Sequence, residues 1–130
     1  MAIIGVGIDI AEIARVAGAL ARHGERFVRR VYTPLEAEYC KSGAGLASAG
    51  RFAGRWSAKE AFYKALPPGV QPFASWLSVQ ITSDPAGRPI IEVLDERLKR
   101  ALNEAGVSSI HLSITHERTH CAAVAILEGF

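Results

Sequence analysis

Apolar residues occupy every second position near the start of the chain. Ile4, Val6 and Ile8 alternate with two glycines and with Asp9. Because a period of two is typical of a half-buried β-strand, we predict a strand over residues 3–8. The alternation places Asp9 and the glycines on the face opposite the apolar one.

The longest helical pattern covers residues 46–66. Phe52, Trp56 and Tyr63 recur at helical spacing along it, and Pro67 ends it. Shorter helices are predicted over residues 10–22, directly after Thr33-Pro34, and over residues 94–105. Strands are predicted over residues 76–81, 89–94, 110–114 and 122–127, the last two forming a hairpin closed by residues 115–120. This order predicts an α+β fold in which a mainly antiparallel sheet packs against a long helix.

Composition narrows the class of protein. A chain of 130 residues suits a single domain, residues 1–130, and 49% hydrophobic with 22% charged residues fits a globular protein. The net charge of +2 gives no general argument for binding nucleic acid. The N-terminal segment has no basic start and carries Asp9, so we expect neither a signal peptide nor a membrane span. Cys40 and Cys121 form no CxxC and are expected to be reduced, as in a cytoplasmic protein.

Charged residues border the apolar stripe of the long helix. Lys59 falls inside the stripe, Glu60 lies at its edge, and Lys64 follows one turn later. A charge on an apolar face needs a partner, because desolvating it alone is costly. Two simpler interpretations stay open: an exposed Glu60–Lys64 pair, and a capping box from Ser57 to Glu60.

Asp9 has two interpretations of its own. It can cap the helix that follows, with Glu12 at the third position. Alternatively, it is a ligand at a strand end, and Gly5 and Gly7 leave room for the bound group.

Two further patterns suggest other functions. Residues 116–120 read His-Glu-Arg-Thr-His, a match to the H-E-x-x-H zinc motif, which needs a helix; a turn between strands is predicted here. Arginines at spacings of seven, four and three form a basic stripe if the first helix continues. That stripe is a solvated face or a nucleic-acid surface without the usual aromatics. The stripe consists of Arg15, Arg22, Arg26 and Arg29. Two alternative functions therefore remain to be tested: a zinc hydrolase, and a non-catalytic basic module that binds acidic partners.

Three motifs together resemble the holo-acyl-carrier-protein synthases, the short 4'-phosphopantetheinyl transferases. The motifs are Val6-Gly7-Ile8-Asp9 followed by Arg15; Phe-Ala-Gly-Arg-Trp-Ser-Ala-Lys-Glu-Ala-Phe-Tyr-Lys over residues 52–64; and His-Leu-Ser-Ile-Thr-His over residues 111–116. The resemblance implies a transferase that moves 4'-phosphopantetheine from coenzyme A to a serine of an apo-acyl carrier protein, in fatty acid biosynthesis. It implies Mg²⁺ bound by Asp9 and Glu60, in keeping with the preference of Mg²⁺ for one or two carboxylates plus phosphate oxygens.

The resemblance also implies binding residues and an assembly. Asp9, Glu60 and Lys64 would form the catalytic group. A homotrimer is implied, with sites at subunit interfaces and the turn Gly87-Arg88-Pro89 completing a neighbour's pocket; neither nucleic acid nor a membrane is an expected partner. Coenzyme A contacts are expected from Arg55, Lys59, Lys64, Arg88, Pro89 and His116, and carrier contacts from Arg15, Arg22 and Arg26. The base that takes the serine proton stays open among Glu60, a metal-bound water and a carrier carboxylate.

Overall fold

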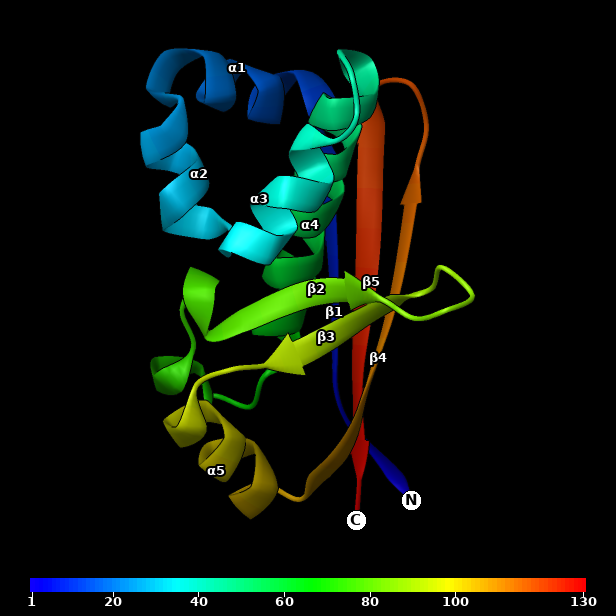
Figure 1. Cartoon of the computed structure of the whole chain (residues 1–130). Helices are drawn as coiled ribbons and strands as arrows, with labels where there is room; N and C mark the ends of the chain where they lie inside the picture. Colours follow the sequence, from blue (N-terminus) through cyan, green and yellow to red (C-terminus); the bar gives the residue numbers. More distant parts are fainter.

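A computed structural model describes the whole chain, residues 1–130 (Figure 1). Its strands are β1 (Ala2–Glu12), β2 (Val79–Ser83), β3 (Pro89–Val93), β4 (Val107–His116) and β5 (His120–Gly129). Its helices are α1 (Ile13–His23), α2 (Glu25–Val31), α3 (Pro34–Lys41), α4 (Leu46–Ala65) and α5 (Glu96–Glu104), with 3-10 turns η1 (Gln71–Phe73) and η2 (Trp76–Ser78).

Two antiparallel sheets share one long helix. β1, β5 and β4 form a three-stranded sheet in that order, and β2 pairs with β3. Helix α4 packs along β1 and β5, while α1, α2 and α3 gather at one end of the molecule and α5 lies at the other (Figure 1). The predicted α+β class, with a mainly antiparallel sheet against a long helix, is confirmed.

The alternation predicted for the first strand is confirmed, but the face that packs on α4 is the one with the glycines and Asp9. Val6, Ile8 and Ile10 are 58%, 67% and 70% exposed, whereas the glycines and Asp9 face α4. A Cβ added at Gly7 would lie 1.9 Å from the Ala61 carbonyl oxygen, so the glycines let the backbones of β1 and α4 come into contact. The room that we assigned to a ligand is filled by the helix.

The other differences lie at element ends. β1 runs on to Glu12, so the first helix starts at Ile13, and Gly24 (φ 52°) breaks it before α2. The segment predicted as a strand from Trp76 begins with η2, and its strand starts at Val79. His116 ends β4 and His120 begins β5, so these histidines flank a hairpin turn and share no helix face.

The core lies between α4, the sheets and α5, where Phe62, Leu98 and Leu127 are fully buried. Cys40 and Cys121 are both buried and free, as predicted. Burial raises the pKa of the Cys40 thiol to about 12, which keeps it protonated. None of the helices combines the length and apolar character that crossing a bilayer requires.

Candidate active site

Asp9, on the first strand, is a carboxylate that is largely enclosed by the protein. Its side chain is 13% exposed, and one oxygen, Oδ1, accepts a hydrogen bond from the Lys64 ammonium at 3.2 Å. The other oxygen, Oδ2, is buried without any hydrogen-bond partner. A buried carboxylate oxygen without a partner is costly, and in native proteins it points to a bound ion or water.

Glu60 supplies a second carboxylate to the same place. Asp9 and Glu60 line one hollow of about 590 Å³, between the end of β1, α1 and α4. Burial raises the pKa of Glu60, the negative charge of Asp9 raises it further, and Lys64 opposes both effects. Two carboxylates that repel each other, with one ammonium beside them, form a site that favours a further cation.

The donor set fits Mg²⁺. Both candidate ligands, Asp9 and Glu60, are carboxylates, and Asp9 has a buried oxygen without a partner. No three His, Cys, Asp or Glu side chains lie close enough together to hold a metal by themselves. A cation at Asp9 and Glu60 would therefore complete its shell with water or phosphate oxygens, which is the usual arrangement for Mg²⁺.

The same hollow reaches the basic helix. It is lined by Arg15 and Arg22 of α1, which lie seven positions apart, together with the two carboxylates. Phe27 and Trp56 line it with aromatic rings. Arg26 lies on α2, beyond the break, and does not line the hollow. Two of the three predicted carrier-binding arginines are therefore placed beside Asp9 and Glu60.

Lys59 differs from its expected role. Its side chain is only 2% exposed, and its ammonium contacts Glu36 Oε1, the Val31 carbonyl and the Trp76 carbonyl, each at 2.7 Å. An ammonium has three N–H donors, and all three are used within the chain. Burial lowers the pKa of Lys59, and Glu36 opposes that effect. Lys59 therefore has no free N–H donor for the expected contact with coenzyme A.

The remaining predicted coenzyme A residues lie outside this hollow. Arg55 is buried on another side of α4, with its guanidinium 4.1 Å from the centre of the Tyr39 ring and its Nε unpaired. Arg88 lies in the exposed β2–β3 turn and pairs with Asp84, and Pro89 follows it. His116 lines a separate hollow at the β4–β5 turn. Within one chain, Lys64 alone of the six has its charged group paired with a carboxylate of this hollow, through its contact with Asp9.

A comparison with known families defines the class. Residues 5–125 match the family model described as the 4'-phosphopantetheinyl transferase superfamily. The chain therefore belongs to that superfamily, and the resemblance seen in its motifs is confirmed.

Closer relatives are more specific. The chain is 38% identical over 126 residues to the holo-[acyl-carrier-protein] synthase of Koribacter versatilis, covering 97% of this chain and 98% of the relative. It is 40% identical over 125 residues to the enzyme of the same description from Solidesulfovibrio magneticus, covering 96% and 98%. Within the superfamily, the chain belongs with the holo-[acyl-carrier-protein] synthases.

Solved structures agree with the sequence relatives. The fold is similar to that of holo-[acyl-carrier-protein] synthase from Neisseria meningitidis, with a TM-score of 0.83, 28% identity and coverage of 98% and 99% of the two chains. It is also similar to the Helicobacter pylori enzyme in complex with coenzyme A, with a TM-score of 0.79, 29% identity and coverage of 95% and 99%.

Sequence reasoning missed Glu36, the buried partner of Lys59. Thr33 and Glu36 form a capping box at the start of α3: the Thr33 hydroxyl accepts from the Glu36 backbone N–H, and Glu36 accepts from the Thr33 N–H. The signal was present, since Thr-Pro-Leu-Glu has the spacing of such a box. Its second use, as counter-ion to a lysine far along the chain, has no local signal.

Proposed function

We propose that this chain transfers 4'-phosphopantetheine from coenzyme A to a serine of an apo-acyl carrier protein in a Mg²⁺-dependent reaction, as part of fatty acid biosynthesis in the cytoplasm. The observation that supports it most is the pair Asp9–Glu60, with an unpartnered buried oxygen and with Lys64 alongside. The similar Helicobacter pylori enzyme was solved in complex with coenzyme A, and the sequence relatives are synthases of the holo-acyl-carrier protein.

In this proposal each residue has a separate task. Asp9 and Glu60 hold Mg²⁺, which when bound acts as a Lewis acid on the pyrophosphate. Lys64 neutralises charge on the phosphate oxygens, since its ammonium is half exposed beside Asp9. The carrier serine oxygen forms a bond to the phosphorus that carries the pantetheine arm, and the serine proton passes to one of the three candidate bases. The bond from that phosphorus to the bridging pyrophosphate oxygen breaks, and adenosine 3',5'-bisphosphate leaves with that oxygen. Catalysis then rests on positioning and electrostatics, as in other phosphoryl transfers. Release of adenosine 3',5'-bisphosphate in proportion to modified carrier tests this stoichiometry; release without modified carrier contradicts it.

We further propose a homotrimer whose sites lie between subunits. Arg55, Arg88, Pro89 and His116 lie outside the hollow of their own chain, so a neighbour's copies would complete the coenzyme A pocket. The outer face of the three-stranded sheet supports assembly, because apolar side chains continue across it. Ile8 pairs with Val124, and Val6 pairs with Ile126. An exposed apolar patch of this kind is typical of an interface between subunits.

An Ile8→Lys variant is expected to be monomeric. The lysine charge would be buried unpaired in the proposed interface, which is strongly unfavourable. Light scattering after size exclusion should give the mass of one chain instead of three, and transfer should fall in parallel. Leu94→Lys, at an exposed apolar position in the β3–α5 connection, should leave the mass unchanged. A wild-type protein of single-chain mass would refute the assembly.

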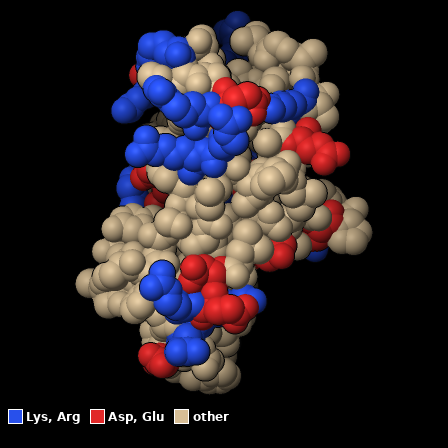
Figure 2. Space-filling model, turned by 60° about the vertical axis from the view of Figure 1, so that its left-hand side comes forward, with Lys and Arg blue, Asp and Glu red and all other residues tan.

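Carrier docking is proposed for the basic end of the molecule. Figure 2 shows Lys and Arg gathered over the end that carries α1 and α2, whereas charges of both signs mix at the other end. Arg15, Arg22 and Arg26 belong to the basic end. Complementary charge at such a surface mainly steers encounter and sets orientation.

Arg22→Glu is therefore expected to raise the KM for the carrier about 10-fold, because like charges then face each other. The KM for coenzyme A should change little, and the difference between variant and wild type should shrink at high salt. Arg100→Glu, on α5 at the opposite end, is the matched control. Equal carrier KM values for both variants would argue against this surface.

A further inference from the structure

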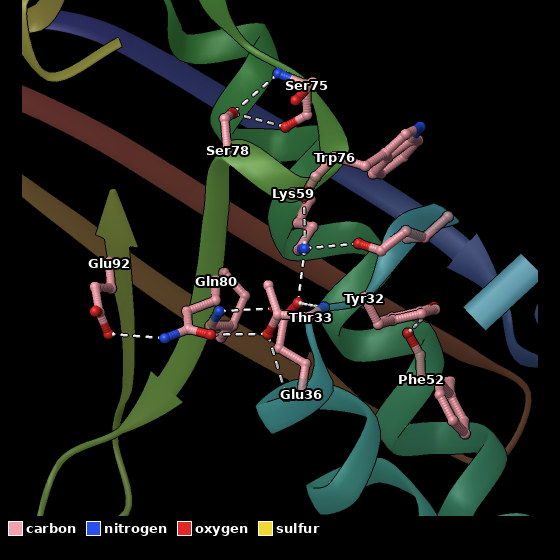
Figure 3. Close-up of polar contacts among 12 residues, drawn as sticks. Tyr32, Thr33, Glu36, Phe52, Lys59, Ser75, Trp76, Ser78, Gln80 and Glu92 are labelled. Atoms are coloured by element: carbon pink, nitrogen blue, oxygen red, sulfur yellow. Dashed lines mark hydrogen bonds and ion pairs between the residues drawn. The ribbon is translucent and has the colours of Figure 1, made fainter. Parts of the chain in front are cut away.

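The contacts of Lys59 join three separate parts of the fold to α4. Figure 3 shows its ammonium between the Glu36 carboxylate and the Trp76 carbonyl. Glu36 belongs to α3, Trp76 to η2, and the third acceptor, Val31, ends α2. One side chain thus fixes α4 relative to the α2–α3 connection and to the segment before β2.

Glu36 extends the same contact in a second direction. While Oε1 faces Lys59 and the Thr33 N–H, Oε2 accepts a hydrogen bond from the Ile81 N–H of β2 at 2.7 Å. Both side chains are almost completely enclosed, at 2% and 0% exposed. The pair is therefore fully satisfied and rigid, as a buried ion pair must be.

Glu60 lies directly between two immobilised residues of α4. On one side of it in sequence, Lys59 is fixed by its three acceptors. On the other, the Ala61 backbone packs against β1 at Gly7 so closely that no Cβ fits between them. These two contacts fix the rotation of α4 about its own axis, and that rotation decides where the Glu60 carboxylate points.

Lys59 also fixes a wall beside the proposed site. The Trp76 ring stacks on Trp56 with centroids 4.4 Å apart, and Trp56 lines the hollow of Asp9 and Glu60. Glu60 also lines a second hollow of about 300 Å³, together with Trp76 and Phe62. Because Lys59 holds the Trp76 carbonyl, it fixes a segment that lines this second hollow.

We propose that Lys59, paired with Glu36, is a positioning residue for the transfer reaction: it orients Glu60 and the Trp76 wall without touching coenzyme A. The proposal rests on the proposed function of the Asp9–Glu60 site. Net stability is a poor explanation for the pair, since replacing a buried ion pair by uncharged groups is often neutral or stabilising. A positioning role instead explains why the pair is joined to the helix that carries Glu60.

Two variants separate positioning from stability. Lys59→Met leaves the Glu36 charge buried alone and should lower the Tm by about 10 °C. Adding Glu36→Gln removes that charge and should restore part of the Tm; the restoration is partial because the amide NH2 cannot accept from one of the two backbone N–H groups that the carboxylate serves. Both variants should nevertheless show a kcat about 100-fold below wild type, because a displacement of about 1 Å at a reacting site has an effect of that size. Lys99→Met, which breaks the exposed Lys99–Glu96 pair on α5, is the control and should match wild type.

The response of the Tm to added Mg²⁺ gives a readout apart from activity. We expect it to be clearly smaller in the double variant than in wild type, because Glu60 is displaced. A double variant with partly restored Tm, wild-type kcat and a wild-type Mg²⁺ response would overturn the positioning role. If neither Met variant folds, Lys59→Arg keeps the charge but changes the contact geometry, and a wild-type kcat there would overturn it equally. A wild type that transfers nothing contradicts the proposed function instead.

Discussion

Replacing Glu60 by Gln, or Asp9 by Asn, is expected to lower kcat/KM for transfer by about 1000-fold, even at saturating Mg²⁺. Each change keeps the size of the side chain but removes one of two carboxylates in the hollow. A bound metal contributes several kcal/mol of transition-state stabilisation, and about 4 kcal/mol corresponds to this factor. The measurement is initial rates of carrier modification across a Mg²⁺ titration. Rates within about 10-fold of wild type would place the metal elsewhere.

Thermal unfolding provides the control for these variants. The pKa of Glu60 is raised above its ordinary value of 4.5, chiefly by burial and then by the charge of Asp9. A carboxyl with a raised folded-state pKa stabilises the fold below its unfolded value, and this contribution is lost as pH rises through the folded value. In EDTA, wild type should therefore lose stability from pH 4.5 upward at this site, and Glu60→Gln should lose less. Mg²⁺ at a hundred times its Kd should raise the wild-type Tm by about 10 °C and leave both variants nearly unchanged.

Gly7→Ala is expected to destabilise the fold by at least about 3 kcal/mol, at the upper end of what overpacking normally costs. The new Cβ would lie 1.9 Å from the Ala61 carbonyl oxygen and 2.7 Å from the Ala65 nitrogen. Both are backbone atoms of α4, so no side chain can turn away to make room. Since total stability is about 5–15 kcal/mol, much of the protein should unfold in mild denaturant. Chemical denaturation followed by circular dichroism measures the effect.

Gly50→Ala is the matched control because Gly50 lies in α4 itself. A Cβ at this position meets nothing within 4 Å, so alanine should stabilise the helix by about 1 kcal/mol. Opposite signs at the two positions would establish that contact between β1 and α4 is the cause. A Gly7→Ala protein as stable as wild type would mean that β1 and α4 are further apart.

Periodicity predicted the type and order of most elements. The helix expected over residues 46–66 is α4, Leu46–Ala65, and the two strand pairs occur in the expected places. The same periodicity placed Asp9 and the glycines of β1 opposite its apolar residues, as the structure has them, but did not indicate which face meets the core. The glycines allow a helix backbone to approach on their side. Alternation along the sequence does not show whether an apolar face of a strand packs on the core or lies on the surface of the single chain.

The parts of the site differ in how far sequence reasoning could place them. That Lys59 would need a partner followed from its position in an apolar stripe. That this partner is Glu36, 23 positions earlier, depends on how α3 packs against α4, which no local pattern encodes. The helix breaks at Gly24, where φ is positive, and this break puts Arg26 on a different helix from Arg22. Helical periodicity gives no sign of a change at one backbone angle.

Transfer activity and its dependence on the Asp9–Glu60 site are tested together by the intact mass of an apo-acyl carrier protein after incubation with this protein, coenzyme A and Mg²⁺. We expect the carrier to gain the mass of one 4'-phosphopantetheine group. We expect no gain with EDTA and none with the Asp9→Ala/Glu60→Ala double variant. A carrier mass that never changes across several apo carriers, or a gain that survives loss of both carboxylates, would contradict the proposed function.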